Sequence, residues 1–155
     1  MINTKFKKTE IGIIPEDWEV IKLGTISIYT NRGITPSYSD KDGLVIINQK
    51  CIRDGKINHL HSKITNPQKK IIPKEKYLQL FDILINSTGV GTVGRVAQIK
   101  KVDCGLTADS HVTILRLNLE KINPIFVGLY LRKIEKSIEK MAIGTTGQVE
   151  LSRKV

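Results

Sequence analysis

Residues 81–99 read Phe-Asp-Ile-Leu-Ile-Asn-Ser-Thr-Gly-Val-Gly-Thr-Val-Gly-Arg-Val-Ala-Gln-Ile. The apolar run Phe81–Ile85 predicts a buried strand, and Val93–Ile99 alternates between apolar and polar residues as a second strand does. The residues between these two runs are mostly polar or glycine, which is typical of a turn. The segment therefore predicts two strands joined by a glycine-rich turn.

The same turn contains a literal G-x-G-x-x-G pattern from Gly89 to Gly94, with Asp109 twenty positions after Gly89. That pattern can mark a dinucleotide-binding site, but the site requires a helix to open at the third glycine. Here the residues after Gly94 have the alternation of a strand, so the dinucleotide interpretation is rejected. Glycines can instead bring backbone N–H groups close to a partner, and the alternative is a plain tight turn with Arg95 on a solvated face.

Other segments predict further elements of one domain. Strand patterns occur at Trp18–Leu23, Leu44–Ile47 and His111–Leu117, whereas residues 31–37 have loop chemistry and Asp54-Gly55 marks a tight turn. One helix is predicted from an N-cap at Asn123 to a C-cap at Gly144. Its apolar stripe would lie along a rod of roughly 30 Å and consists of Val127, Leu131, Ile134, Ile138 and Met141. The fold class predicted is α+β, a twisted, mostly antiparallel sheet with one long helix near the C-terminus.

Composition narrows the choice of partner. The 155 residues include 25 Lys and Arg against 15 Asp and Glu, a net charge of +10. This charge favours nucleic acid or an anionic membrane as partner, although basic residues can also serve solubility alone. No apolar run approaches the roughly 20 residues of a membrane span, and the N-terminus has no secretory pattern. The isolated Cys51 and Cys104 suit a reducing compartment, so we expect a cytoplasmic protein without a membrane partner.

Four segments in register resemble a known family. They are Thr9–Val20 (TEIGIIPEDWEV), Asp82–Gly89, Gly91–Val96 and Gly144–Arg153 (GTTGQVELSR). The resemblance that they carry extends over nearly the whole chain, in the order found in the target recognition domain of type I restriction–modification specificity subunits. The resemblance implies one domain over residues 1–155, with the conserved helical spacer that normally follows absent or truncated.

The resemblance also implies a function. Such a domain reads a few base pairs of double-stranded DNA, one half of a split target, and has no active site of its own. Modification (methyltransferase) and restriction subunits would supply methylation and cleavage, and would use the S-adenosylmethionine, ATP and Mg²⁺ that this chain does not bind. A half-length subunit would also allow self-association. The alternative function is a nucleic-acid or protein interaction module without base readout.

The sequence lacks the motifs expected of a DNA-modifying enzyme, a nuclease or a metal site. A DNA amino-methyltransferase needs an Asn/Asp-Pro-Pro-aromatic loop, but the strings at Asn66-Pro67 and Asn123-Pro124 lack the second proline. The carboxylates do not cluster as a Mg²⁺-dependent nuclease requires. The spacings of the two cysteines and three histidines match no zinc pattern. We therefore predict no catalytic residue and no metal ligand.

Candidate DNA contacts are polar or basic side chains on loops, together with loop glycines. Arg95 could bridge guanine O6 and N7, and Gln148 could bond adenine. His111 is either structural or a polar DNA contact. The predicted set is Arg32, Tyr38, Asn48, Gln49, Lys50, Arg53, Ser87, Thr88, Gly89, Gly91, Thr92, Arg95, His111, Thr145, Thr146 and Gln148.

Overall fold

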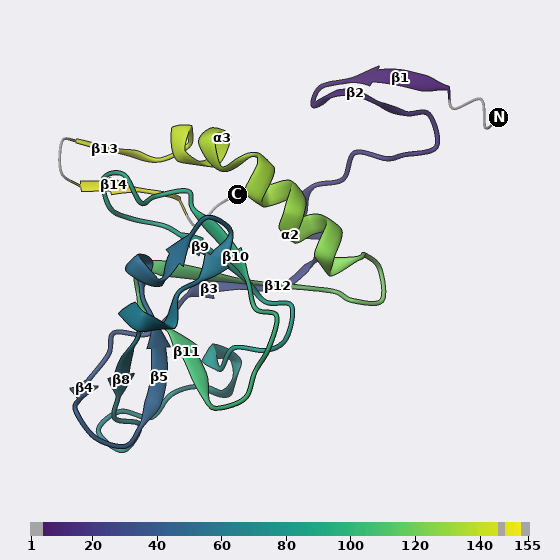
Figure 1. Cartoon of the computed structure of the whole chain (residues 1–155). Coiled ribbons are helices and arrows are strands. Elements are labelled where there is room, and N and C mark those ends of the chain that lie inside the picture. Colours follow the sequence, from purple (N-terminus) through teal and green to yellow (C-terminus); the bar gives the residue numbers. More distant parts are fainter. Residues whose placement is uncertain (1–4, 146–147, 153–155) are drawn as a thin grey trace.

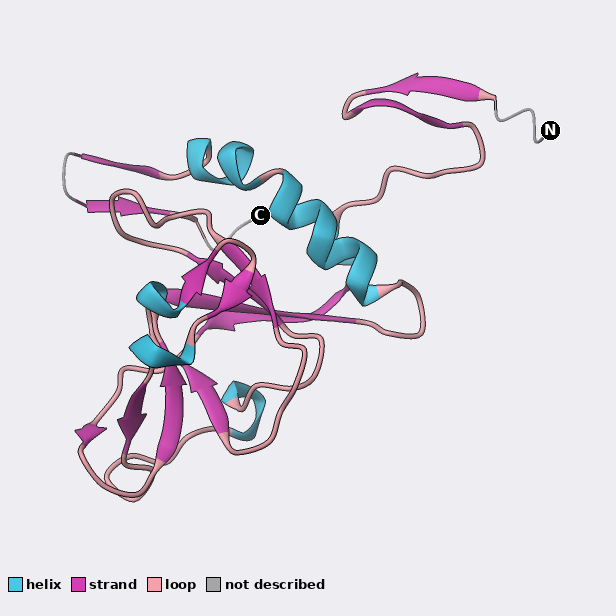
Figure 2. Ribbon diagram, viewed as in Figure 1, coloured by secondary structure: helices cyan, strands magenta, loops and turns pink. Residues whose placement is uncertain are grey.

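Two four-stranded sheets form the body of the molecule (Figures 1 and 2). The computed structural model describes residues 5–145 and 148–152. The first sheet is antiparallel and has the order β10–β9–β12–β3, with strands β3 (Ser27–Arg32), β9 (Ile83–Asn86), β10 (Val96–Gln98) and β12 (Val112–Leu117). The second has the order β11–β5–β8–β4, with strands β4 (Tyr38–Ser39), β5 (Leu44–Ile47), β8 (Lys63–Thr65) and β11 (Leu106–Ala108), and its β11–β5 pair is parallel.

Shorter elements decorate these sheets. Three hairpins form two-stranded sheets of their own: β1 (Phe6–Thr9) with β2 (Gly12–Pro15), β6 (Ile52–Arg53) with β7 (Lys56–Ile57), and β13 (Ile143–Thr145) with β14 (Gln148–Glu150). The helices are α1 (Leu23–Ile26), α2 (Pro124–Lys133) and α3 (Glu135–Lys140), and the 3₁₀ turns are η1 (Gln49–Cys51), η2 (His59–His61) and η3 (Lys74–Lys76). The β1–β2 hairpin stands apart from the body (Figure 1).

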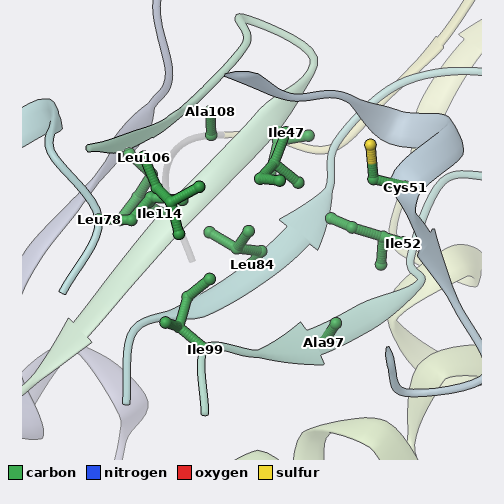
Figure 3. Close-up of a cluster of buried hydrophobic side chains, with 11 residues drawn as sticks. Ile47, Cys51, Ile52, Leu78, Leu84, Ala97, Ile99, Leu106, Ala108 and Ile114 are labelled. Carbon is green, nitrogen blue, oxygen red and sulfur yellow. The ribbon is translucent and has the colours of Figure 1, made fainter. Parts of the chain in front are cut away.

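The alternation of β12 creates a core on each face of the first sheet. Val112 and Ile114 belong to a buried cluster that the second sheet covers, where they meet Ile47, Leu84 and Leu106 (Figure 3). Leu115 and Leu117 point to the other face and belong to a second cluster, which includes Val127, Leu131 and Ile138 from the helices. The first sheet is therefore the middle layer, as strand periodicity requires when both faces are buried.

A buried ion pair lies at the edge of the first core. Asp82 is fully buried, and both of its carboxylate oxygens accept from Arg116, at 2.8 Å from Nε and 2.7 Å from Nη2. The Nη2 atom of Arg116 also donates to the Tyr77 carbonyl at 2.9 Å. This two-pronged pairing fixes the start of β9 against β12.

The chain passes between the two sheets at Gly33. Its N–H donates to the Val112 carbonyl of the first sheet at 2.9 Å, and the N–H of Ile34 donates to Ala108 of the second sheet at 2.8 Å. A Cβ placed on Gly33 would lie 2.0 Å from the Ala108 carbonyl oxygen. Only glycine leaves room for this crossing.

The α+β class and the mostly antiparallel pairing are confirmed, but the predicted single sheet is two sheets. The strands predicted at Leu44–Ile47, Phe81–Ile85, Val93–Ile99 and His111–Leu117 correspond to β5, β9, β10 and β12, and Asp54-Gly55 forms the β6–β7 turn. The strand predicted at Trp18–Leu23 is wrong. These residues are irregular until α1 begins, because the Trp18 ring packs edge-on against Phe126 of α2, with 5.4 Å between ring centroids, instead of facing a sheet core. The loop predicted from Asn31 begins later, since β3 extends to Arg32.

The predicted helix is interrupted. Asn123 is its N-cap, with the side-chain oxygen accepting from the Ile125 and Phe126 amides. At Ile134, however, the backbone leaves helical geometry (φ −100°, ψ 17°), so the rod becomes α2 and α3. Just after the break, the Glu135 carboxylate accepts from the Val96 amide of β10 at 2.8 Å.

The end of that helix also differs from the prediction. The stripe residues Val127, Leu131 and Ile138 are buried as predicted, whereas Met141 is exposed. Gly144 is not a C-cap, because α3 ends at Lys140 and Gly144 lies in β13. Among the described residues, no helix has the length and apolar character needed to cross a membrane.

Candidate nucleic-acid interface

The glycine loop between β9 and β10 is closed by its own backbone. Gly89, Gly91 and Gly94 all have positive φ (+97°, +71° and +85°), a backbone conformation that residues other than glycine rarely adopt. The amides of Thr92 and Val93 donate to the Gly89 carbonyl at 3.2 and 2.9 Å. The loop leads directly into β10 and opens no helix, which agrees with rejection of the dinucleotide interpretation.

The second glycine-containing segment lies beside this loop. The Gly89 amide donates to the Val149 carbonyl at 3.3 Å, and the Leu151 amide donates to the Ser87 carbonyl at 2.8 Å. Thr88 also forms a β-bridge with Glu150. Figure 1 shows β13 and β14 next to the loop that follows β9. The described parts of the two segments thus share one side of the molecule, and Thr146 and Gly147 lie outside the described residues.

Two further segments reach the glycine loop. The Asn86 side-chain amide donates to the Gln49 carbonyl of η1 at 2.9 Å, and a Cβ on Gly89 would lie 2.8 Å from Gln49 Oε1. On another side, His111 Nδ1 lies 2.7 Å from the Thr88 hydroxyl, and the His111 carbonyl accepts from the Ser87 amide. Four separate parts of the chain therefore converge. We call the accessible residues of η1, the glycine loop and the His111 turn the loop face: Gln49, Lys50, Thr88, Gly89, Val90, Gly91, Thr92, Arg95 and His111.

The loop face carries donors suited to an anionic partner. Lys50 and Arg95 are cationic, and the Arg95 guanidinium donates to the Gly91 carbonyl at 2.7 Å, which holds it against the loop. The Thr88 hydroxyl pairs with His111 Nδ1 at 2.7 Å, and the Thr92 hydroxyl donates to the carbonyls of Thr88 and Gly89 at 3.1 and 3.2 Å. Lysine, arginine, hydroxyl and backbone N–H groups are the usual donors to phosphate oxygens.

The carboxyl group nearest His111 along the chain is buried. Asp109 Oδ1 accepts from the His111 amide at 2.9 Å, and Asp109 is only 4% exposed. Desolvation by this burial raises the pKa of Asp109, while the His111 amide and the His111 charge act in the opposite direction. A raised pKa means that this carboxyl keeps its proton to a higher pH than an exposed aspartate does.

This raised pKa predicts a pH dependence of stability. Between the ordinary and the raised pKa, native Asp109 holds a proton that the unfolded chain has released, so the free energy of unfolding falls as pH rises through that window. The side chain of an Asp109→Asn protein cannot ionise. We therefore expect its free energy of unfolding, measured by urea denaturation from about pH 4 to pH 7, to fall less with rising pH than that of the parent. Parallel curves for Asp109→Asn and the parent would contradict this; Asp17→Asn, at an exposed carboxylate, is the surface control.

Three predicted DNA contacts are corrected by their burial. Arg32 is 6% exposed and bonds Glu150, Ser110 and Leu151. Asn48 accepts from the Lys50 amide and donates to the His61 carbonyl, so its amide caps η1 and joins η1 to η2. Ser87 is 1% exposed, and its hydroxyl pairs with Thr113 at 2.6 Å. These side chains hold the loops together and do not present themselves to a partner.

Other predicted residues lie outside the loop face. Tyr38 is exposed on edge strand β4, where the Lys63 amine sits 4.5 Å from its ring centroid. Arg53 ends β6 beside the Asp54-Gly55 turn, and a Cβ on Gly55 would meet the Arg132 side chain of α2. The backbones of Thr145 and Gln148 pair with each other across the β13–β14 hairpin, which lies beside the loop face.

Val90 and Glu150 were not among the residues predicted from the sequence. Val90 is an exposed apolar residue of the glycine loop, with 68% of its surface accessible. An exposed apolar side chain of this kind can contact the methyl group of thymine. Its place between two glycines was a usable signal. Glu150 pairs with Arg32 at 2.7 Å, and no local pattern indicated this contact.

No protein-family model matches the chain. Curated relatives match it in sequence. The chain is 34% identical over 146 residues to a protein of Methanocaldococcus jannaschii named as a type I restriction enzyme MjaX specificity subunit, and 29% identical over 152 residues to the MjaVIII specificity subunit of the same organism. These matches cover 89% and 90% of the chain and 34% of each relative. The chain is a homologue of type I specificity subunits.

The chain spans about a third of the length of these specificity subunits. It also has the fold of part of the solved ones. The specificity subunit from M. genitalium superimposes with a TM-score of 0.57 at 14% identity, over 98% of this chain and 32% of that one. The HsdS subunit from Thermoanaerobacter tengcongensis gives 0.59 at 17% identity, over 94% and 35%. A chain from a study of assembly and conformational transition of the type I restriction–modification system gives 0.64 at 18% identity, over 91% and 32%.

Proposed function

We propose that this homologue of specificity subunits recognises a short sequence in double-stranded DNA, as one target recognition domain of a type I restriction–modification system. One observation supports this most directly. Four separate parts of the chain converge at the loop face, which combines cations, hydroxyls and an exposed loop, and the exposed carboxylate of Glu150 beside it is paired with Arg32. Such a surface offers both phosphate donors and groups that read base edges.

The proposed mechanism has two contributions. The net charge of +10 attracts the DNA backbone in a salt-dependent way that carries no sequence information. Arg95, Gln49 and the glycine loop then discriminate bases by hydrogen bonds and by the contact of Val90 with an apolar base edge. In this proposal both contributions act on the same stretch of duplex, because Arg95, Gln49 and the glycine loop all belong to the loop face.

Chemistry on the DNA would belong to partner proteins. In this proposal the modification subunits methylate with S-adenosylmethionine and the restriction subunits cleave with ATP and Mg²⁺, and the present chain directs them as a non-catalytic subunit in the cytoplasm. Self-association remains part of the proposal for a half-length subunit.

Selection from random duplexes tests the function. Purified chain, with and without its methyltransferase partner, is incubated with a pool of random double-stranded DNA, and bound molecules are sequenced over several rounds. We expect one short sequence to be enriched and to remain bound against excess competitor DNA. Binding that shows no enrichment and disappears at high salt would instead identify a charge-only interaction module.

Arg95 provides a sharper test of base reading. For an Arg95→Ala protein we expect a loss of about 5- to 150-fold in affinity for the selected site, the range of one bidentate base contact, and relaxed choice at one base position. Affinities are measured by fluorescence anisotropy on duplexes that differ at single positions.

The matched control is Lys101→Ala. Arg95 precedes β10, whereas Lys101 follows its opposite end and pairs with Asp103. We expect Lys101→Ala to retain the sequence preference of the parent. If Arg95→Ala binds every duplex as the parent does, Arg95 is not a reader of bases.

A further inference from the structure

Arg32 is a buried cation that joins parts of the chain far apart in sequence. It ends β3, and its Nη1 donates to the Ser110 carbonyl at 3.2 Å. Its Nη2 donates to Glu150 Oε1 at 2.7 Å and to the Leu151 carbonyl at 3.1 Å. One guanidinium therefore holds the loop before β12 and the end of the β13–β14 hairpin at a fixed separation.

Both of these segments support the glycine loop. Ser110 is followed by His111, which bonds the Thr88 hydroxyl. Leu151 follows Glu150, and its amide donates to the Ser87 carbonyl at 2.8 Å. Arg32 is thus connected to the loop face through two separate routes, although it is itself only 6% exposed.

We propose that Arg32 is a positioning residue for sequence readout: it sets the spacing of the His111 loop and the β13–β14 hairpin on either side of the glycine loop, and does not contact DNA. This inference rests on the proposed function. It also assigns a role to Glu150, whose carboxylate is 59% exposed beside the loop face and is neutralised by Arg32. Without that cation, a carboxylate beside the interface would repel phosphates.

Lysine cannot replace this arrangement. The planar guanidinium donates in several fixed directions at once, whereas an ammonium is a point charge on a flexible stem. An Arg32→Lys protein keeps the charge and removes the geometry. It therefore separates positioning from simple electrostatic attraction.

The test compares Arg32→Lys with the parent in two measurements. In the free protein, we expect two-dimensional NMR to show shifted amide signals at Thr88, Gly89 and His111, while signals near Lys101 stay in place. On DNA, we expect the ratio of affinities for selected and unrelated duplexes to fall about tenfold, the effect of one lost base contact. The slope of log Kd against log salt should be unchanged, because no phosphate contact is removed.

Variants of Glu150 provide the controls and cover the case in which Arg32→Lys does not fold. Glu150→Gln keeps the Oε1 acceptor but removes the counter-charge of Arg32, so we expect its affinity ratio to fall less than that of Glu150→Ala. Glu150→Ala removes the acceptor at an exposed position, and should lower the affinity ratio in the same direction by up to about fivefold.

Two results would overturn the inference. One is an Arg32→Lys protein with parental amide signals and a parental affinity ratio. The other is an equal loss on all duplexes with a salt slope smaller by about one, which would make Arg32 a phosphate contact. Failure of the proposed function is distinguishable, because the parent itself would then select no site, and the NMR measurement alone would decide whether Arg32 positions the loops.

Discussion

Replacement of Asp82 by alanine is expected to lower the free energy of unfolding by about 3–5 kcal/mol, because it leaves the guanidinium of Arg116 largely buried without its counter-ion. Asp82 is fully buried and Arg116 is 12% exposed, so water cannot replace the lost carboxylate well. Asp82 also accepts from the Gln79 amide at 2.8 Å, and this donor would lose its partner as well. Urea unfolding followed by circular dichroism measures the change.

The exposed ion pair of Lys101 and Asp103 is the matched control for that experiment. Its N···O distance of 2.6 Å is as short as that of the buried pair, but both side chains are more than half exposed. We expect Asp103→Ala to cost no more than about 1 kcal/mol, since solvent screens exposed pairs. Equal losses for Asp82→Ala and Asp103→Ala would show that burial does not determine the strength of the Asp82–Arg116 contact.

A Gly33→Ala protein is expected to lose about 3 kcal/mol or more of stability, because the new methyl group overlaps backbone that two sheets hold in place. The Cβ would lie 2.0 Å from the Ala108 carbonyl oxygen and 2.3 Å from that of Asp109. Neither atom belongs to a flexible side chain. Relief would require the separation of β3 from β11, and this should appear as a lower thermal midpoint and increased hydrogen exchange at Ile34.

Gly24→Ala controls for the loss of glycine flexibility. Gly24 lies in α1, and no atom would come within 4 Å of its Cβ. Alanine favours helix over glycine by up to about 1 kcal/mol, so we expect stability equal to or slightly above that of the parent. A Gly33→Ala protein as stable as Gly24→Ala would contradict the crowding that the structure shows at the sheet crossing.

Local pattern was sufficient to predict most of the central strands. β5, β9, β10 and β12 are all rich in apolar residues. The apolar runs and alternation that predict them correspond to strands in the fold because each strand contributes side chains to a core. β11 is only three residues long, too short for a period to be visible. The interruption at Ile134 also has no local sign, because it coincides with a tertiary bond from Glu135 to β10 and involves neither proline nor glycine.

The candidate site, too, was predicted from the sequence only in part. The glycine loop was predicted because glycines and hydroxyls are adjacent in sequence. The burial of Arg32 was not, because its acceptors Ser110, Glu150 and Leu151 lie 78, 118 and 119 positions away. A polar residue at the end of a strand looks like a surface residue until the distant segments that surround it are known.

The pairing of β3 with β12 and of β5 with β11 has a consequence for synthesis of the protein. The first sheet is complete only after Val112–Leu117 has been synthesised and can pair with Ser27–Arg32. The second is complete only after Leu106–Ala108 has been synthesised and can pair with Leu44–Ile47. On the ribosome, the early strands therefore emerge with apolar residues such as Ile46 and Ile47 uncovered while some sixty more residues are translated. Because contacts between distant residues form slowly, chaperones that bind exposed strands would meet this chain before it can fold.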